Sequence, residues 1–591
     1  ETTLPRCLES VRGAVDEMII VDTGSTDSTR EIARRYGAKV FSTQWKNDFS
    51  FHRNQSIARA KGRWILQLDA DECLEPDHAI KLRETVSSAP RDVSHLLCLM
   101  RDYRNGRPIS EAVLIRLFRN GLGIRFENPI HERPVITEGL GLGTDIVIRH
   151  FGYALSEAKM RAKFERNHRI LKNLLEKDPG DPFTLYYMAV TLFNYDLESC
   201  IRWGEKLLQE FVPGKSFPLF CMNIFYVLAA AHMRRGNLEE AERVCQRAIE
   251  VFPACVDAYW TLVDIAFRTG RFDMVLNHGS NYFQHFGHYL KNRGKFPGLI
   301  VYSIDKGPEI HLMMALAYLH FGKTGKAKMH IHPLLGESLP PAGSVDRVQA
   351  FLDEWDVPAD MQIPLLAFLA DMCPGEFPEN PFAELLLSRF MELPEDEDFR
   401  KPNKAFSLIS CDSDLLLKVA GVLYREDLDT HLRTLLGCAC DLPPDLHLFR
   451  IIPLMDEGEI EAAIMELDTF LKQSGTPIDR NLETLGDVAE LFEECAHKIH
   501  VSGDVEKAAI LHEAAFQVSP RTDILKHLLS CLQEIGAIRQ IRKFILIGAR
   551  LGLLEREDIS ELYRRMENRL QTSFEESPVS SSETHRNLLL H

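Results

Sequence analysis

The stretch from Trp64 to Glu72 runs from an apolar segment directly into three carboxylates, Asp69, Asp71 and Glu72. Three acids in four positions repel one another unless a cation relieves the repulsion. Hard divalent cations such as Mg²⁺ or Mn²⁺ bind carboxylate oxygens and can bridge them to a substrate diphosphate. The spacing therefore favours metal-assisted chemistry on a phosphorylated ligand. The structural alternative is an acidic helix N-terminus, where negative charge is also favourable.

The elements around these acids must bring them to one edge of a sheet. The apolar run is short and follows Gly62, which favours a buried strand that ends at the acids. Further strands are expected at 17–21 and 39–41, and helices at 4–15, 25–36 and 49–60. Strands that alternate with helices predict a parallel sheet with both faces covered, and ligands of such sheets bind beyond the carboxyl ends of the strands.

A polar turn, residues 22–27, leaves the first expected strand and opens a helix. Its backbone N–H groups and hydroxyls could bind a nucleotide. The alternative is an ordinary loop with a helix cap at Ser25 or Thr26.

Three motifs in this order and spacing resemble the family 2 inverting glycosyltransferases of GT-A fold, over about the first 155 residues. They are Val21-Asp-Thr-Gly-Ser-Thr-Asp27, Trp45-x-x-Asp48-Phe49-Ser50-x-x-Arg53-Asn54 and Leu68-Asp-Ala-Asp-Glu72. The resemblance continues through Arg116-Leu-Phe-Arg119, Ile130-His131-Glu132 and His150-Phe-Gly-Tyr153.

The resemblance implies a nucleotide-diphosphate sugar as donor. Asp22 and Thr23 match the turn that contacts its base and ribose. Arg53 and Asn54 match the segment near its base and phosphates.

The resemblance also implies a Mn²⁺ or Mg²⁺ ion at the Asp69-x-Asp71 signature. Asp71 would bind the metal, and Asp69 would contact the ribose or the metal. His150 stands where such enzymes often place a further metal or diphosphate contact. A hydrogen-bonded core histidine is the alternative for His150.

An inverting transfer needs one base that takes the proton of the acceptor and a cation that stabilises the leaving diphosphate. Glu132 is the candidate base, and His131 could orient the acceptor or donate to the phosphate. A structural ion pair for Glu132 and a buried structural imidazole for His131 are the alternatives. Glu111 and Asp102 are other candidates for the base.

The composition of the 591 residues, 45% hydrophobic and 26% charged, is that of a soluble protein, with no apolar run long enough to span a membrane. Peripheral membrane contact is compatible with this. Thirteen scattered cysteines without a CxxC pair indicate reduced thiols and a cytoplasmic protein. Residues 1–153 are near neutral, with 22 basic and 21 acidic residues, whereas the remainder carries 47 and 65, which argues against nucleic acid as a partner.

Only helical periodicity follows residue 153. Gly236 and Gly270 lie 34 residues apart in similar turns, and Gly503 and Gly536 lie 33 apart. The surrounding small residues resemble tetratricopeptide (TPR) repeats, whose concave surface suits a protein or peptide partner. Scaffolding of the catalytic domain or self-association is the alternative. The expected parts are 1–153 (GT-A domain), 154–335 (TPR-like repeats), 336–450 (irregular helices), 451–571 (a second TPR-like array) and 572–591 (a disordered tail).

The predicted fold is an α/β GT-A (Rossmann-like) domain followed by an all-α TPR-like solenoid. The predicted function is metal-assisted inverting transfer of a sugar from a nucleotide-diphosphate sugar to a protein, peptide or glycan acceptor. The family's first strand would precede Glu1, so a fragment or weakened donor binding is expected. A TPR binding scaffold with an inactive or truncated transferase domain is the rival hypothesis. A nucleotidyltransferase is less favoured, because the start of the chain has no glycine-rich phosphate loop.

Overall fold

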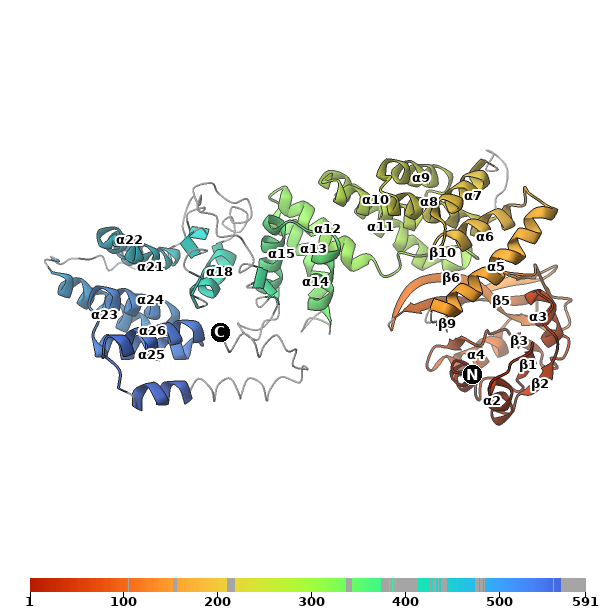
Figure 1. The fold of residues 1–591 in the computed structure, drawn as a ribbon, viewed down its shortest axis with the longest axis horizontal. Coiled ribbons are helices and arrows are strands. Elements are labelled where there is room, and N and C mark those ends of the chain that lie inside the picture. The colour runs from red at the N-terminus through yellow and green to blue at the C-terminus, as the bar shows by residue number, and fades with distance from the viewer. Residues whose placement is uncertain are drawn as a thin grey trace. The chain divides into compact units, whose positions relative to one another are not determined.

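The computed structural model describes residues 1–104, 106–152, 157–209, 218–335, 343–373, 413–425, 444–473, 484–555 and 557–564, with a few scattered residues between 382 and 482. Figure 1 labels its elements along the chain. The chain divides into two compact units, Glu1–Ala317 and Tyr318–His591. Each is described by itself below. The finer division made from the sequence stays a prediction.

The first unit begins with alternating helices and strands. These are α1 (Leu4–Ser10), β1 (Ile19–Asp22), α2 (Thr29–Arg35), β2 (Lys39–Ser42), α3 (Phe49–Ile57), β3 (Trp64–Leu66), β4 (Glu72–Leu74) and α4 (His78–Ser88). Five more strands follow: β5 (Val93–Arg104), β6 (Arg107–Arg119), β7 (Arg125–Glu127), β8 (Arg133–Val135) and β9 (Leu140–His150). The α/β class predicted for this part of the chain is confirmed.

The strands form a parallel pair β1–β2, an antiparallel pair β7–β8 and one larger sheet. The larger sheet has the order β10-β6-β5-β9-β4, and β3 also pairs with β6. Only β5 and β9 run parallel among its pairs. The prediction of an all-parallel sheet is therefore wrong for this sheet. The reason is local: β5 ends at Arg104 and β6 begins at Arg107, with Gly106 at a φ of 77° between them, and so short a turn requires antiparallel strands.

An apolar core joins the larger sheet to α1 and α4. Its members include Val11, Leu82, Leu96, Met100 and Ile148, all nearly inaccessible to solvent. Burial of these side chains provides the main stabilisation of this layer. It also holds the ends of β3, β4 and β9, which carry the acids and His150, against one scaffold.

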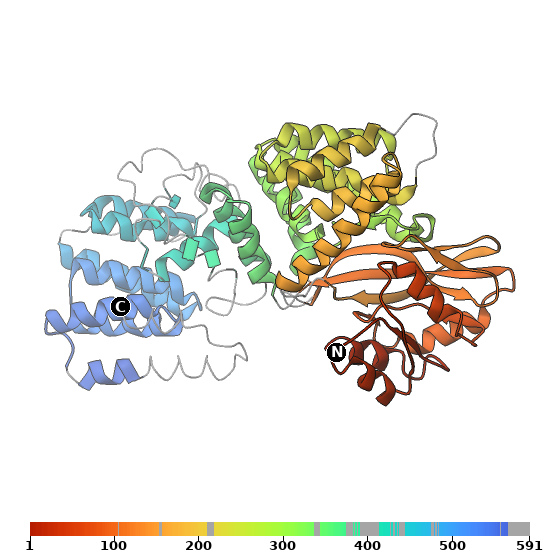
Figure 2. The ribbon, with the colours of Figure 1, turned by 45° about the vertical axis from the view of Figure 1, so that its right-hand side comes forward.

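After β9 the chain of the first unit continues mainly as helices (Figures 1 and 2). They are α5 (Glu157–Lys177), α6 (Pro182–Leu192), α7 (Leu197–Gln209), α8 (Asn223–Arg234), α9 (Leu238–Val251), α10 (Val256–Arg268) and α11 (Phe272–Asn292), with short 3₁₀ turns η1 (Leu219–Met222) and η2 (Arg293–Lys295). Gly236 and Gly270 lie just after the ends of α8 and α10. Their φ values of 76° and 67° are in the left-handed region, which residues with a side chain rarely adopt. The predicted repeat turns are confirmed.

One strand interrupts this helical part, which the sequence had indicated to be helical throughout. This strand, β10 (Ile300–Val301), pairs with Ala112 and Glu111 of β6. Asp257 of α10 fixes it from the other side, since its carboxylate accepts hydrogen bonds from the N–H groups of Tyr302 and Ser303. Two residues are too short a strand to be recognised from hydrophobic periodicity.

The second unit is helical throughout its described residues. The helices are α12 (Gly307–His320), within which the division falls, α13 (Thr324–Leu335), α14 (Ser344–Glu354), α15 (Ala359–Met372), α18 (Ser413–Arg425), α20 (Leu446–Phe449), α21 (Ile451–Asp456), α22 (Ile460–Gln473), α23 (Leu485–Val501), α24 (Val505–Val518), α25 (Thr522–Glu534) and α26 (Ile538–Arg550). Gly503 and Gly536 occupy the turns after α23 and α25 with positive φ, as their spacing predicts. The predicted tail, 572–591, and much of 374–443 lie outside the described residues.

Among the described helices, none combines the length and apolar character needed to cross a bilayer. The ten cysteines whose state the structure gives are free and buried, as the scattered spacing predicts.

Candidate active site

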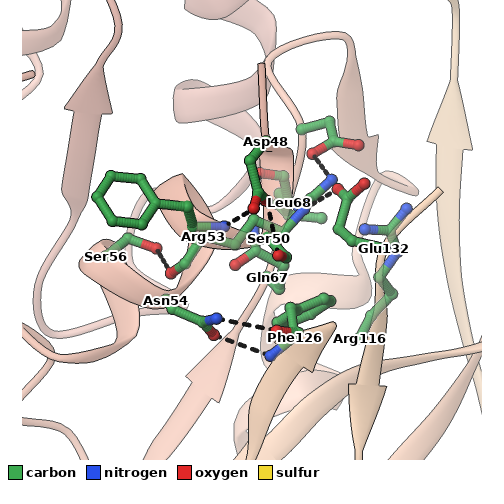
Figure 3. A network of polar contacts seen from close by, with 12 residues as sticks. Asp48, Ser50, Arg53, Asn54, Ser56, Gln67, Leu68, Arg116, Phe126 and Glu132 are labelled. Atoms are coloured by element: carbon green, nitrogen blue, oxygen red, sulfur yellow. Dashed lines mark hydrogen bonds and ion pairs between the residues drawn. The ribbon is translucent and has the colours of Figure 1, made fainter. Parts of the chain in front are cut away.

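Arg53 on α3 is the centre of the candidate site (Figure 3). Its helix begins where the Asp48 side chain accepts a hydrogen bond from the N–H of Phe51, which fixes the first turn. The Arg53 guanidinium forms ion pairs with Asp69 Oδ1, at 2.6 Å, and with Glu132 Oε1. Burial lowers the pKa of Arg53, but the charges of Asp69 and Glu132 outweigh burial and raise it overall. One cation therefore holds two of the predicted site residues.

Asn54, the neighbour of Arg53, binds protein backbone. Its amide donates to the carbonyl of Phe126 at 2.9 Å and accepts from the N–H of Phe126 at 2.8 Å (Figure 3). These two bonds hold β7 against α3. Asn54 therefore positions β7 and the loop after it, which leads to Glu132.

The three clustered acids separate into different environments. Glu72 is almost fully buried and pairs with Arg116, and its other oxygen accepts from the N–H of Asp69 at 2.9 Å. Burial raises the pKa of Glu72 to about 7. The side chains of Asp69 and Asp71 are 38% and 34% exposed, so they alone of the three present substantial carboxylate surface to a ligand.

Asp71 faces His150 across the end of the sheet. The ladder of β4 and β9 sets Glu72 opposite His150, and that of β5 and β9 sets Asp102 beside it. His150 Nδ1 lies 2.6 Å from Asp102 Oδ1, and Nε2 lies 3.6 Å from Asp71 Oδ2. Burial disfavours charge on His150, but the two carboxylates outweigh burial and raise its pKa to about 10.

Gly152 keeps the space between Asp71 and His150 open. A Cβ atom at this position would lie 2.8 Å from Asp71 Oδ2 and closer still to His150 Nε2. Sequence reasoning did not single out Gly152, although the glycine of His150-Phe-Gly was a visible signal. Tyr153, the last residue of that motif, lies outside the described residues.

The turn after β1 is closed by its own carboxylate. Asp22 is buried, and its side chain accepts hydrogen bonds from the N–H groups of Gly24 and Ser25 at 3.2–3.3 Å. This turn delays α2 to Thr29, later than the sequence predicts, with no side-chain cap at Ser28. Thr23 lies in the same turn, half-buried. Within the described part of the chain, no hydrogen bond or ion pair joins Asp22 or Thr23 to Arg53.

His131 and Glu132 follow a strained loop. His131 has a φ of 51° and Asn128 a φ of 78°, conformations that are uncommon for residues with a side chain. The His131 ring stacks on Tyr187 of α6 with centroids 3.8 Å apart. Burial lowers the pKa of His131 to about 3, so the ring is neutral at neutral pH. The Glu132 side chain is 8% exposed and bound to Arg53.

The two alternative bases lie in tight polar networks. Glu111 has no exposed surface and binds Arg101, Arg293 and the hydroxyl of Tyr289. Asp102 binds His150 and the hydroxyl of Ser110. Burial sets Glu111 apart from the other two candidates, because the side chains of Asp102 and Glu132 are 19% and 8% exposed.

With this geometry described, comparison with known proteins gives the class. Residues 1–125 match the family model described as glycosyl transferase family 2. Residues 1–125 are therefore similar to the family 2 glycosyltransferases. The match covers α1 to β6 and includes Asp22, Arg53, Asp69 and Asp71, and it ends before Glu132 and His150. Helices follow the matched segment along the chain, as the resemblance predicts.

Particular relatives match longer stretches of the chain than the family model does. A TPR repeat-containing protein of Synechococcus elongatus is 35% identical over 260 residues, 42% of this chain and 62% of that protein. The SPbeta prophage-derived glycosyltransferase SunS of Bacillus subtilis is 25% identical over 263 residues, 43% of this chain and 61% of SunS. The chain thus spans about three fifths of the length of these curated relatives. Among solved structures, the C-terminal part of a TPR repeat-containing protein from Cytophaga hutchinsonii aligns with 63% of this chain and 98% of its own at 11% identity, with a TM-score of 0.24.

Proposed function

We propose that the chain transfers a sugar from a nucleotide-diphosphate sugar to a protein or peptide acceptor, with inversion and with the help of a divalent cation. The observation that carries this proposal is the double ion pair of Arg53, which ties Asp69 of the acidic signature to Glu132. A donor contact and a candidate base thus share one guanidinium. Such a link fits a single displacement, in which donor and acceptor must be held on opposite sides of one carbon atom.

The donor would lie over the ends of β1, β3 and β4. Asp22 and Thr23 would contact the base and ribose, Arg53 the phosphates, and Asp69 the ribose. Asn54 would act through the Phe126 backbone that it holds. The partial exposure of Asp69 supports its role, since its carboxylate is reachable by a ligand hydroxyl.

The site suits Mn²⁺ or Mg²⁺. Asp71 Oδ2 and His150 Nε2 lie 3.6 Å apart with no side chain at Gly152 to fill the space between them. Two protein ligands are enough for a cation that takes its other ligands from phosphate and water. Such a cation would stabilise the charge that develops on the leaving diphosphate. A bound cation would displace the proton from His150 Nε2. Asp102 would then orient the ring by accepting the remaining N–H bond from Nδ1, as outer carboxylates do in metal sites.

Glu132 would take the proton of the acceptor. In the displacement, the acceptor atom forms a bond to the anomeric carbon as the bond to the diphosphate breaks, and the proton of the acceptor passes to Glu132. Arg53 would hold the carboxylate in place and exclude other orientations. Neutral His131 would position the acceptor, since its pKa of about 3 leaves it uncharged.

The helical region supports a protein or peptide acceptor over a glycan. Tyr187 of α6 stacks on His131 and accepts a hydrogen bond from Arg133, so a helix side chain lies next to the candidate base. An acceptor chain bound along these helices would reach Glu132 without crossing the donor site.

The test is Glu132→Gln, which keeps the shape of the side chain and removes the proton acceptor. UDP- and GDP-sugars with Mn²⁺ would first identify the donor by thermal shift. Transfer should then fall by about 10²-fold or more, the scale of general-base catalysis, while donor affinity changes little. Glu127→Gln is the matched control, because Glu127 lies five residues earlier and pairs with Arg125 at the surface. Weaker donor binding with an unchanged maximal rate would instead make Glu132 a donor contact. Peptide and glycan acceptors assayed in parallel decide the acceptor class.

A further inference from the structure

Three successive helices of the second unit bring two histidines and a glutamate together, apart from the transferase residues. Glu493 lies on α23, His512 on α24 and His527 on α25. Each offers a ligand atom, and these three atoms all lie within 4.8 Å of one another. Glu493 Oε1 is 2.6 Å from His512 Nδ1, and Oε2 is 3.2 Å from His527 Nδ1.

A third imidazole borders this group. His497 lies four residues after Glu493, so both side chains are on the same face of α23. Its ring centroid is 5.1 Å from that of His527 and 6.1 Å from that of His512. Three imidazoles therefore surround one carboxylate at the surface of the helical array.

The burial of His512 is costly in this arrangement. Its side chain is 1% exposed, and its Nε2 atom is buried without a hydrogen-bond partner. A buried polar atom that lacks a partner costs free energy, so the position of this ring needs a compensating interaction. Its other nitrogen, Nδ1, faces Glu493 at 2.6 Å, so this nitrogen fixes the ring and is the atom that would bind a metal ion.

We propose that Glu493, His512 and His527 bind a Zn²⁺ ion. Two imidazoles and one carboxylate form a ligand set that zinc accepts, whereas Mg²⁺ and Ca²⁺ prefer oxygen ligands only. With zinc–nitrogen bonds of about 2.0–2.1 Å, neighbouring ligand atoms of a tetrahedron lie about 3.3 Å apart. The separations of 2.6 and 3.2 Å from Glu493 to the two imidazoles are shorter than this value, so the ligand atoms would part by up to about 0.7 Å to admit the ion. Water or His497 completes the tetrahedron.

The ion would bind three consecutive helices to one another. Each ligand comes from a different helix, so the bound ion opposes their separation and stabilises the folded array by mass action. This site is independent of the proposed transferase chemistry, because its three ligands lie in the second unit and none belongs to the candidate active site.

The experiment uses the full chain, treated with chelator and then freed of it. Calorimetry with Zn²⁺ should show one equivalent bound, with a rise in the melting temperature that Mg²⁺ does not produce. His527→Asn and Glu493→Gln should each weaken the binding by about tenfold or more. His527 is 45% exposed, so its replacement leaves the packing of the helices intact. His447→Asn is the matched control. His447 lies 2.5 Å from Glu466 in a similar pair, and this pair belongs to no cluster of three possible metal ligands among the described residues.

Co²⁺ in place of Zn²⁺ gives a second measurement. Visible absorption of bound Co²⁺ without a thiolate charge-transfer band, lost in His527→Asn and kept in His447→Asn, supports the proposal. A thiolate band would assign the bound ion to cysteines and overturn it. Zn²⁺ affinity that is unchanged in both ligand variants, or no binding stronger than that of Mg²⁺, would also overturn it.

Discussion

The Gly152→Ala variant tests the geometry of the candidate cation site most directly. The new methyl carbon would lie 2.8 Å from Asp71 Oδ2 and nearer to His150 Nε2, whereas ordinary contacts begin near 3.4 Å. Gly152 does not have a positive φ, so the backbone accepts alanine without strain there. The contact can be relieved only by moving the two candidate ligands apart.

The magnitude follows from the displacement required. To reach an ordinary contact, His150 Nε2 must move by about 1 Å and Asp71 Oδ2 by about 0.6 Å. A misplacement of about 1 Å in a reacting assembly costs about 10²-fold in rate. We therefore expect transfer to fall about 100-fold and the Mn²⁺ concentration for half-maximal rate to rise. The melting temperature should change little, because the shift is confined to partly exposed side chains.

The assay is transfer at increasing Mn²⁺, with Gly143→Ala as control. Gly143 lies on β9, nine residues before Gly152, but a Cβ atom there would meet only Gly294 Cα at 3.5 Å, an ordinary contact. Equal rates and equal Mn²⁺ dependence in Gly152→Ala and wild type would refute the assignment of the cation to the Asp71–His150 pair.

Three further predictions concern single carboxylates. Asp71→Asn should abolish transfer and leave the melting temperature unchanged. Chelator should abolish the transfer activity of the wild type, and added Mn²⁺ or Mg²⁺ should restore it; activity in excess chelator would contradict this. Glu111→Gln should destabilise the first unit by about 3–5 kcal/mol in urea unfolding, because it leaves Arg101 and Arg293 facing a neutral side chain; a change below about 1 kcal/mol would show that the network is dispensable. Burial raises the pKa of Asp257 from 3.8 to about 6. The folded state therefore favours the protonated form of Asp257. This preference contributes about 3 kcal/mol to the free energy of unfolding, and the contribution is fully present below pH 3.8 and is lost as the pH rises through 6. Asp257→Asn should remove that part of the pH dependence, measured as the difference between the two unfolding curves.

The motifs predicted the α/β class, the repeat turns and the approximate positions of most elements. Those features depend on local signals, such as the Asp48 cap of α3 and the glycines that end helices. The directions of the strands in the larger sheet were not predictable from alternation, because the hairpin at Gly106 sets them.

The candidate site was predictable only in part, since its contacts join distant segments. The motif order indicated Arg53, Asp69 and Glu132, but the ion pairs that link them depend on how α3 meets the loop after β7. The contact of Tyr187 with His131 joins positions 56 residues apart, and the sequence carries no local signal for it. The difference between Glu72 and Asp71 likewise arises from burial alone.

The strand β10 bears on how such chains can be divided or recombined. It closes the edge of the sheet at β6, and the segment before it supplies Arg293 and Tyr289 to Glu111. A cut at the end of β9 would therefore expose a row of backbone donors and acceptors and leave a buried carboxylate without two of its partners. The sheet and the helices up to β10 therefore form one structural unit that cannot be separated without loss of these contacts. An exchange of helical arrays between relatives would preserve the sheet only if the crossover fell after Val301.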